Sequence, residues 1–203
     1  MATTQTQLMG LTLSSPIIVG SSGLTAGPTP IQKAADAGAG AVVLKSLFEE
    51  QIRMNIAREA GKGGVVYGQE DIDGFISYYE RKHSIDGYYK TSRETKDAVD
   101  IPVIASINAT TDKEWFAISS QIVDAGADAL QLNLFVPAFG DPGASTVIEE
   151  IYCNALRRVK EVADIPVAVK IGSHFTNMTR IVSMLKDAGA DAVVMFNRYY
   201  RPD

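Results

Sequence analysis

The stretch Asp124-Ala-Gly-Ala-Asp-Ala-Leu-Gln-Leu-Asn133 decides the fold, because close variants of it recur at residues 36–45 and 187–196. Each copy reads as the end of a helix, a glycine that stops it, and a short apolar strand of the kind buried on both faces. A second phrase, Asp-Ile-Pro-Val, begins similar strands at residues 100–106 and 164–170. This alternation predicts a parallel α/β sheet built from βα units.

Six strands and four main helices follow from this pattern. The strands are expected at Pro16–Gly20, Ala41–Lys45, Pro102–Ile107, Ala129–Asn133, Val167–Ile171 and Ala192–Phe196. The helices carry apolar stripes and are expected at Thr29–Ala37, Asp112–Ala125, Thr146–Val162 and Asn177–Ala188. We therefore predict a TIM (β/α)8-barrel type of fold with about six βα units, an incomplete barrel in one domain over residues 1–203. We expect a truncated product; an open sheet, or edges covered by another chain, are the alternatives.

The interval between the second and third strands is too long for one helix and its loops. We assign residues 47–99 to an insertion with helices near Asp71–Lys82 and Tyr88–Val99. Long excursions at the carboxyl ends of barrel strands are often lids or substrate loops. Its aromatic residues, Tyr88 and Tyr89 among them, either cap a planar ligand or pack the insertion's own small core; we prefer the second.

Composition narrows the classes of partner. The net charge of −5 over 203 residues argues against nucleic acid and against an anionic membrane surface. One cysteine, Cys153, excludes an internal disulfide and, with two histidines, leaves little for a metal site, so no metal is expected. There is no signal-peptide pattern and no apolar run near the ~20 residues of a membrane span, so we expect a cytoplasmic protein. We expect a small-molecule substrate and allow for a homodimer.

Polar residues stand at the carboxyl ends of the predicted strands, which form the working face of such sheets. They are Lys45, Ser106, Asn108, Asn133, Lys170 and Asn197. Lys45 and Lys170 would lose hydration under a helix, so we expect them to point into the barrel mouth, where they suit a reduced flavin, an enolate or a phosphate. The alternative is that each lysine forms a structural ion pair. The turn Gly20-Ser-Ser-Gly23 either offers amides to a ligand or is a simple turn.

These residues resemble the dihydroorotate dehydrogenase family, whose members are FMN-bound (β/α)8 barrels. The resemblance is carried, in order, by Gly20-Ser-Ser-Gly23, Leu44-Lys-Ser46, Ala105-Ser-Ile-Asn108, Leu132-Asn-Leu134, Val169-Lys-Ile171 and Phe196-Asn197. It implies hydride transfer between FMN and a small planar, pyrimidine-like substrate, in pyrimidine metabolism. The implied cofactor contacts are Ser21, Ser22, Lys45, Ser46, Asn108, Asn133 and Lys170, with Lys170 near the flavin N1 edge. The implied substrate contacts are Lys45, Asn133 and Asn197.

The chain departs from the family at the catalytic base. The family has Asn-x-Ser/Cys-Pro-Asn after strand four, whereas this chain has Asn133-Leu-Phe-Val-Pro-Ala138, which puts Val136 at the base position. Valine cannot transfer a proton. The base is therefore unknown, with Lys45, Asp141 and His174 as candidates. The family's phosphate-binding loops follow strands seven and eight, beyond the six strands predicted here.

Two other functions stay open. One is a flavin-free TIM-barrel lyase or isomerase that uses Lys170 as a Schiff-base or electrophilic residue. The other is an inactive fragment that binds nothing.

Overall fold

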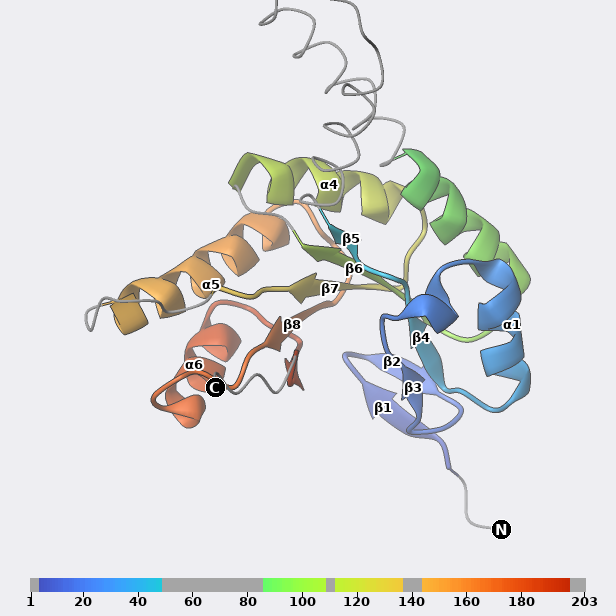
Figure 1. Ribbon diagram of the computed structural model, residues 1–203, viewed down its shortest axis with the longest axis horizontal. Coiled ribbons are helices and arrows are strands. Elements are labelled where there is room, and N and C mark those ends of the chain that lie inside the picture. Colours follow the sequence, from blue (N-terminus) through green and yellow to red (C-terminus); the bar gives the residue numbers. More distant parts are fainter. Residues whose placement is uncertain (1–3, 49–85, 109–111, 137–143, 198–203) are drawn as a thin grey trace, which may run out of the picture.

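A computed structural model describes residues 4–48, 86–108, 112–136 and 144–197. Within these residues, six parallel strands form one curled sheet in the order β3-β4-β6-β7-β8-β9 (Figure 1). Their bounds are β3 (Ile18–Val19), β4 (Ala41–Val43), β6 (Val103–Asn108), β7 (Ala129–Asn133), β8 (Val167–Ile171) and β9 (Ala192–Met195). The predicted fold class is therefore confirmed as an incomplete barrel of the TIM type.

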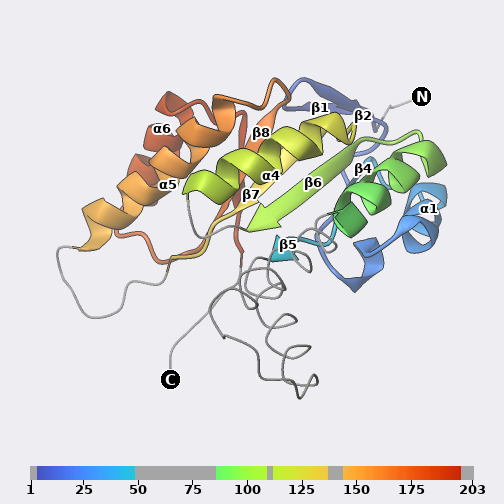
Figure 2. The same cartoon turned by 90° about the horizontal axis from the view of Figure 1, so that it is seen from above.

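The helices lie on the outer, convex side of the sheet (Figures 1 and 2). They are α1 (Pro28–Asp36), a helix over residues 86–98, α4 (Asp112–Asp124), α5 (Ala144–Lys160) and α6 (Met178–Asp187). The glycine stops take the predicted left-handed conformation, with φ of 92° at Gly38, 81° at Gly126 and 102° at Gly189. The same three-residue phrase thus ends a helix in the same way each time.

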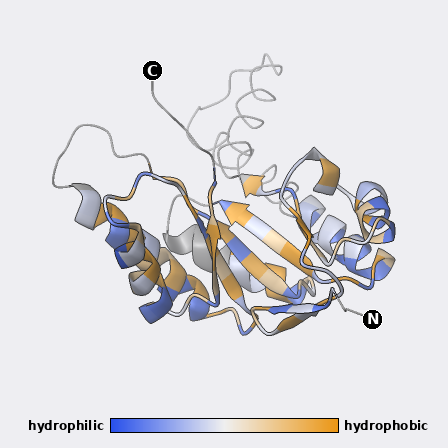
Figure 3. Ribbon diagram, turned by 90° about the horizontal axis from the view of Figure 1, so that it is seen from below, coloured by the Kyte–Doolittle hydropathy of each residue, from blue (hydrophilic) through white to orange (hydrophobic). Residues whose placement is uncertain are grey.

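Two apolar layers flank the sheet. The larger layer packs the strands against the helices and includes Leu130, Leu132, Leu156 and Ile181. In Figure 3 the strands are mostly orange, whereas α5 and α6 carry blue residues as well. A smaller cluster on the concave side includes Val43 and Ile104, and an N-terminal hairpin packs against it.

That hairpin joins β1 (Thr6–Leu8) to the antiparallel β2 (Leu11–Leu13), and the sequence reasoning missed it.

The strand after α1 contains a bulge. Val43 of β4 pairs with Ile104 of β6, and Leu47 of β5 (Leu47–Phe48) pairs with Ile107. Three residues of one strand therefore face two of β6, and one extra residue in a strand redirects the side chains beside it. Leu47 and Phe48 thus continue the sheet, residues 49–85 lie outside the described residues, and 86–98 is a helix beside α1.

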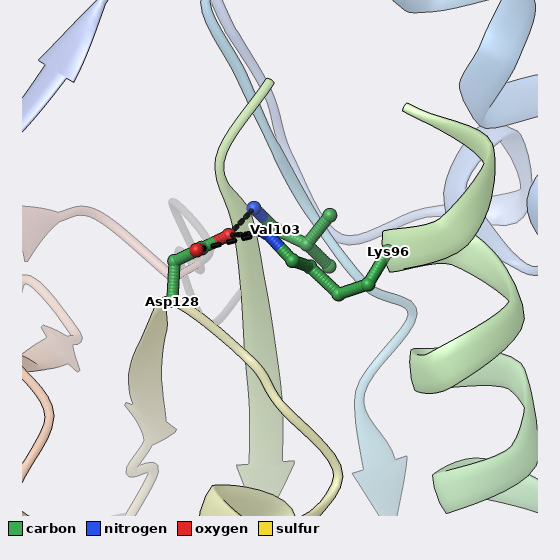
Figure 4. Close-up of polar contacts among 3 residues, drawn as sticks. All are labelled: Lys96, Val103 and Asp128. Atoms are coloured by element: carbon green, nitrogen blue, oxygen red, sulfur yellow. Dashed lines mark hydrogen bonds and ion pairs between the residues drawn. The ribbon is translucent and has the colours of Figure 1, made fainter. Parts of the chain in front are cut away.

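The amino end of β6 is fixed by a carboxylate (Figure 4). Asp128 accepts a hydrogen bond from the Val103 amide at 2.7 Å and from Lys96 Nζ at 2.7 and 2.9 Å. Because β6 begins at Val103, this amide would otherwise lack a partner, and an unpaired buried amide costs free energy. The contact ties helix 86–98, β6 and the start of β7 together.

The third copy of the repeated phrase makes the same contact at β8. Asp191 accepts from the Val167 amide at 2.7 Å and from Lys160 Nζ at 2.9 Å. Both aspartates occupy the fifth position of the repeated phrase, where the first copy has Gly40. A side chain at Gly40 would overlap the Ser15 carbonyl, and the Gly40 amide donates to Ile17 O at 2.8 Å. The first copy therefore closes its unit by backbone contact instead.

Three single features complete the description of the fold. Cys153 is buried, and this burial raises the pKa of its thiol. Among the described helices none has the length and apolar character that a bilayer crossing requires. In the same residues no cluster of three or more His, Cys, Asp or Glu side chains is arranged to hold a metal ion.

Candidate functional site

The concave face holds a cavity of about 290 Å³. Its walls are mainly apolar side chains, with Ser21, Gln131 and Lys170 as the polar members; the apolar ones include Ile18, Val43, Ile104, Ala168 and Val194. Alternate residues of a strand face the same side, so Lys170 shares the concave face with Ala168. A half-buried cation thus stands among apolar groups, where its field is screened less than in water.

A chain of hydrogen bonds runs along the wall of the site from Ser21 to Gln131. The Ser21 and Ser46 hydroxyl oxygens lie 3.0 Å apart, and those of Ser46 and Ser106 lie 2.7 Å apart. Gln131 Nε2 donates to Ser106 Oγ at 3.2 Å, and the Ser46 amide donates to Ser21 Oγ at 2.8 Å. The bulge before Leu47 turns Ser46 toward Ser106, so four segments distant in sequence meet through these side chains.

Tyr88, on the helix over residues 86–98, completes the wall from outside. Its hydroxyl accepts from the Ser106 amide at 2.8 Å and donates to the Ser106 carbonyl at 3.0 Å. The bulge displaces the strand that would otherwise bond these groups, and the phenol takes its place. Burial raises the pKa of the Tyr88 phenol above its ordinary value, so it stays protonated and able to donate.

Two amides meet at the rim beside Lys170. Asn197 Nδ2 donates to Asn133 Oδ1 at 2.7 Å, and Asn133 is buried. Asn133 pairs in register with Lys170 of β8, so the two residues are neighbours across the β7–β8 pair. The backbone amide of Asn197 donates to Ile171 O at 2.8 Å, and this bond fixes the segment after β9. The two residues predicted to read a planar ligand thus lie together.

Other predicted contacts lie elsewhere. Lys45 is exposed, with its amide donating to Thr25 O at 3.0 Å. Ser22 is exposed and caps a short 3-10 helix, η1 (Gly23–Thr25), because its hydroxyl accepts from the Leu24 amide at 3.2 Å. Asn108 is half-buried at the end of β6. None of these three is among the residues that line the described cavity.

The segment after β7 is held by Tyr152 of α5. Its hydroxyl donates to Leu134 O at 3.1 Å and accepts from the Val136 amide at 3.3 Å. Val136 packs against the convex-side core, so the residue at the family's base position belongs to the packing of the fold. Burial raises the pKa of the Tyr152 phenol as well.

Of the catalytic candidates, His174 lies on the loop after β8. Its ring is exposed and meets Phe135 edge-on, with centroids 5.4 Å apart and planes at 71°. Phe135 lies on the segment after β7, so two adjacent segments at the carboxyl ends of the strands are in contact here. Asp141 lies outside the described residues, as does Ala138.

Sequence reasoning missed Gln131 and the roles of two tyrosines. Gln131 had a usable signal, because it is a polar residue at a concave-facing position of an otherwise apolar strand. Tyr88 and Tyr152 had none, since their partners are backbone groups far away in sequence. The preferred expectation for Tyr88 and Tyr89 was wrong in its location: both pack against the sheet's convex-side core.

Comparison with known proteins gives sequence relatives, although no family model matches the chain. It is 31% identical over 193 residues to "Dihydroorotate dehydrogenase B (NAD(+)), catalytic subunit" of Methanosarcina mazei, a match covering 94% of this chain and 59% of that protein. The protein of that name from Anoxybacillus flavithermus is 34% identical over 100 residues, covering 48% of this chain and 32% of its own length. The chain therefore spans under two thirds of these relatives.

Solved structures match the fold. A phosphonopyruvate hydrolase complex with oxalate and Mg²⁺ superposes with a TM-score of 0.56 and 16% identity, covering 93% of this chain and 61% of that one. Identity this low shows a shared fold alone. The sequence matches over most of the chain support the resemblance inferred from the short motifs: this chain is similar to proteins named dihydroorotate dehydrogenase B.

Proposed function

We propose that the chain carries the ring-binding part of an FMN-dependent oxidoreductase site, which transfers a hydride between flavin and a small planar, pyrimidine-like substrate. The observation that carries this proposal is that Lys170, Ser21 and Gln131 line one cavity on the concave face. The sequence relatives support the class of reaction, because both are named dihydroorotate dehydrogenase B.

The residues of this cavity fit the ring of a flavin. The pyrimidine edge of such a ring carries carbonyl oxygens and ring nitrogens, and it becomes electron-rich on reduction. Lys170 supplies a positive charge among apolar side chains, which stabilises negative charge more strongly than a cation in water does. Bound FMN would supply the hydride acceptor, a chemistry that amino-acid side chains lack.

The protein's own groups then have separate tasks. Val43, Ile104 and Val194 give the ring an apolar wall that excludes water. The Asn133–Asn197 pair offers amide donors and acceptors at the rim for the substrate. A proton must also be taken from the substrate, and Val136 is unable to accept one. We assign that task to His174, whose exposed imidazole stands at the carboxyl ends of the strands, with Asp141 as the other candidate.

The test is a titration of the 203-residue chain with FMN and with riboflavin, followed by flavin fluorescence. We expect both to bind with dissociation constants within a few-fold of each other, because the proposed contacts are made to the ring. Lys170→Met should weaken binding at least about tenfold, the scale of one charge-assisted contact. Lys33→Met, on the exposed side of α1, is the matched control and should leave binding unchanged.

Wild-type protein that binds neither flavin would refute this function. In that case, trapping of a carbonyl compound on Lys170 by borohydride would favour the lyase or isomerase alternative, since a Schiff base forms at a lysine amine. Flavin binding that survives Lys170→Met unchanged would place the ring elsewhere on the protein.

A further inference from the structure

The four polar side chains Ser21, Ser46, Ser106 and Gln131 form a continuous chain that ends on the cavity. We propose that Gln131 is a positioning residue that sets the direction of this chain, so that Ser21 presents its hydroxyl hydrogen to the ligand. The proposal rests on the proposed function for the identity of that ligand. It adds a specificity: the bound edge must be rich in hydrogen-bond acceptors.

The direction begins at Gln131. Its Nε2 group can only donate, and it donates to Ser106 Oγ at 3.2 Å. Ser106 is fully buried, and Ser46 Oγ lies 2.7 Å from its hydroxyl oxygen. The buried Ser106 hydroxyl hydrogen needs an acceptor, and within the described residues the Ser46 oxygen is the one in reach, since Gln131 Nε2 only donates. Ser46 is then an acceptor toward Ser106, and its own hydrogen is free for the next oxygen.

The direction ends at Ser21. The Ser46 backbone amide donates to Ser21 Oγ at 2.8 Å, and in the proposed direction the Ser46 hydroxyl, 3.0 Å away, donates to the same oxygen. A hydroxyl has two lone pairs and one hydrogen, so these two bonds use both lone pairs of Ser21. Its hydrogen must therefore be donated, and Ser21 lies in the wall of the cavity. The backbone amide of Ser46 reinforces this end of the chain, because an amide nitrogen cannot accept.

Burial strengthens the effect of these hydrogen bonds on the Ser21 hydroxyl. Ser46, Ser106 and Gln131 are all under 10% exposed, at 7%, 0% and 4%. In such surroundings each hydrogen bond polarises the next, so the terminal hydroxyl is a better donor than a solvated serine. Lys170 lines the same cavity and also has only donors. A ligand edge with carbonyl oxygens or an anionic ring nitrogen could accept from both residues, whereas an edge with N–H groups would be rejected by Ser21.

The first experiment needs no ligand. In the 21.8 kDa chain, the side-chain amide resonances of Gln131 can be observed by NMR. We expect one amide hydrogen to be displaced downfield, and Ser106→Ala to return it toward the value of a solvated glutamine. A Gln131 resonance that is unaffected by Ser106→Ala would overturn the proposal, whether or not flavin binds.

The second experiment measures how the chain affects a ligand. The ratio of dissociation constants for oxidised and two-electron-reduced FMN reports how strongly the site favours an electron-rich ring. Ser21→Ala and Gln131→Met should each lower that preference by about three- to tenfold, the scale of one hydrogen bond. In the Ser21→Ala background, Gln131→Met should have no further effect, because the chain has lost its last member.

The outcomes separate the two proposals. Absence of FMN binding by the wild type refutes the proposed function, while the NMR result still decides whether Gln131 donates to Ser106, the bond at which the proposed direction begins. If the wild type binds FMN but Gln131→Met has an equal effect in the wild-type and Ser21→Ala proteins, the proposed hydrogen-bond chain is refuted and the proposed function is not. A change in thermal stability without a change in the ratio would assign Gln131 a packing role and would also refute the proposal.

Discussion

The two ends of the half-barrel sheet are built in opposite ways. At the amino ends of the strands one contact is repeated: an aspartate holds the first amide of a strand and a lysine of the preceding helix, at Asp128 and again at Asp191. At the carboxyl ends each strand contributes something different, including Ser106, Asn133 and Lys170. Repetition is expected where the only task is to hold successive units together, and variety is expected where one ligand must be surrounded.

The first unit sharpens this contrast, because it keeps the phrase but loses the aspartate. Gly40 stands so close to Ser15 that any side chain would overlap the Ser15 carbonyl. At β6 and β8 a carboxylate can hold the strand, because the helix before each strand carries a lysine, Lys96 or Lys160. In the first unit β3 follows the N-terminal hairpin, and the backbone at Gly40 lies directly against the backbone of Ser15 and Ile17.

The largest effect on stability is expected from Gly40→Ala. The new methyl group would overlap a backbone atom, which cannot rotate away, so β3 and β4 would have to separate. We expect the free energy of unfolding to fall by about 3 kcal/mol or more. Chemical denaturation measures this. Gly87→Ala is the control: it lies near the start of the described helix 86–98 with no other atom close to the new methyl group, and should change stability by less than about 1 kcal/mol. Equal effects of the two changes would contradict the close approach.

A smaller effect is expected from Asp128→Ala, which leaves the Val103 amide without its partner. We expect a loss of about 2 kcal/mol, the scale of a hydrogen bond to a charged group. Lys96→Met removes only the partly exposed ion pair and should cost less than about 1 kcal/mol. Denaturation of both variants at low and high salt separates the contribution of the ion pair, which salt weakens, from that of the hydrogen bond to the Val103 amide. If Lys96→Met costs as much as Asp128→Ala, the ion pair and not the capped amide fixes the strand.

Asp191→Ala should also lower the free energy of unfolding, but by less than Asp128→Ala, because the Asp191 side chain is 36% exposed against 27% for Asp128.

The effect of Tyr88→Phe depends on pH. The change leaves the amide and carbonyl of Ser106 unpaired and should cost about 2 kcal/mol near neutral pH. Burial raises the phenol pKa in the folded protein, whereas the unfolded chain ionises near pH 10. The unfolded state therefore loses its proton first, and the stability that this phenol contributes is present below pH 10 and declines above it.

Denaturation midpoints between pH 8 and 11.5 test this expectation. The wild type should lose stability more steeply above pH 10 than Tyr88→Phe does. Parallel curves for the two proteins would show that the Tyr88 phenol ionises alike in the folded and unfolded states. Tyr152→Phe is a useful comparison at the other half of the rim, because its phenol also bridges a backbone amide and a carbonyl.

The sequence predicted the repeated units well because their signals are local. The glycine after each helix and the apolar run after it are adjacent in the chain, and β7 and β8 have the predicted bounds. The hairpin was missed because its turn uses Met9, at φ 54°, before Gly10, at φ 78°, and Met-Gly lacks the Asn-Gly or Asp-Gly signal of tight hairpins.

The site was predicted in part for the same reason. Lys170, Asn133 and Asn197 end or follow strands, so the rule for parallel sheets located them. The bulge that turns Ser46 toward Ser106 depends on how β4 and β5 pair with β6. This register cannot be predicted from the sequence of either segment alone. Gln131 and Tyr88 act through partners from other units, which only the folded chain brings near.

The phenol of Tyr88 makes the barrel wall continuous from its outer helix to its inner surface. A disturbance applied outside, for example a bulky label beside Tyr88 on the helix over 86–98, would reach Ser106 through one side chain and then Ser46 and Ser21. The lining of the cavity is therefore open to adjustment from a surface that no ligand inside the barrel touches.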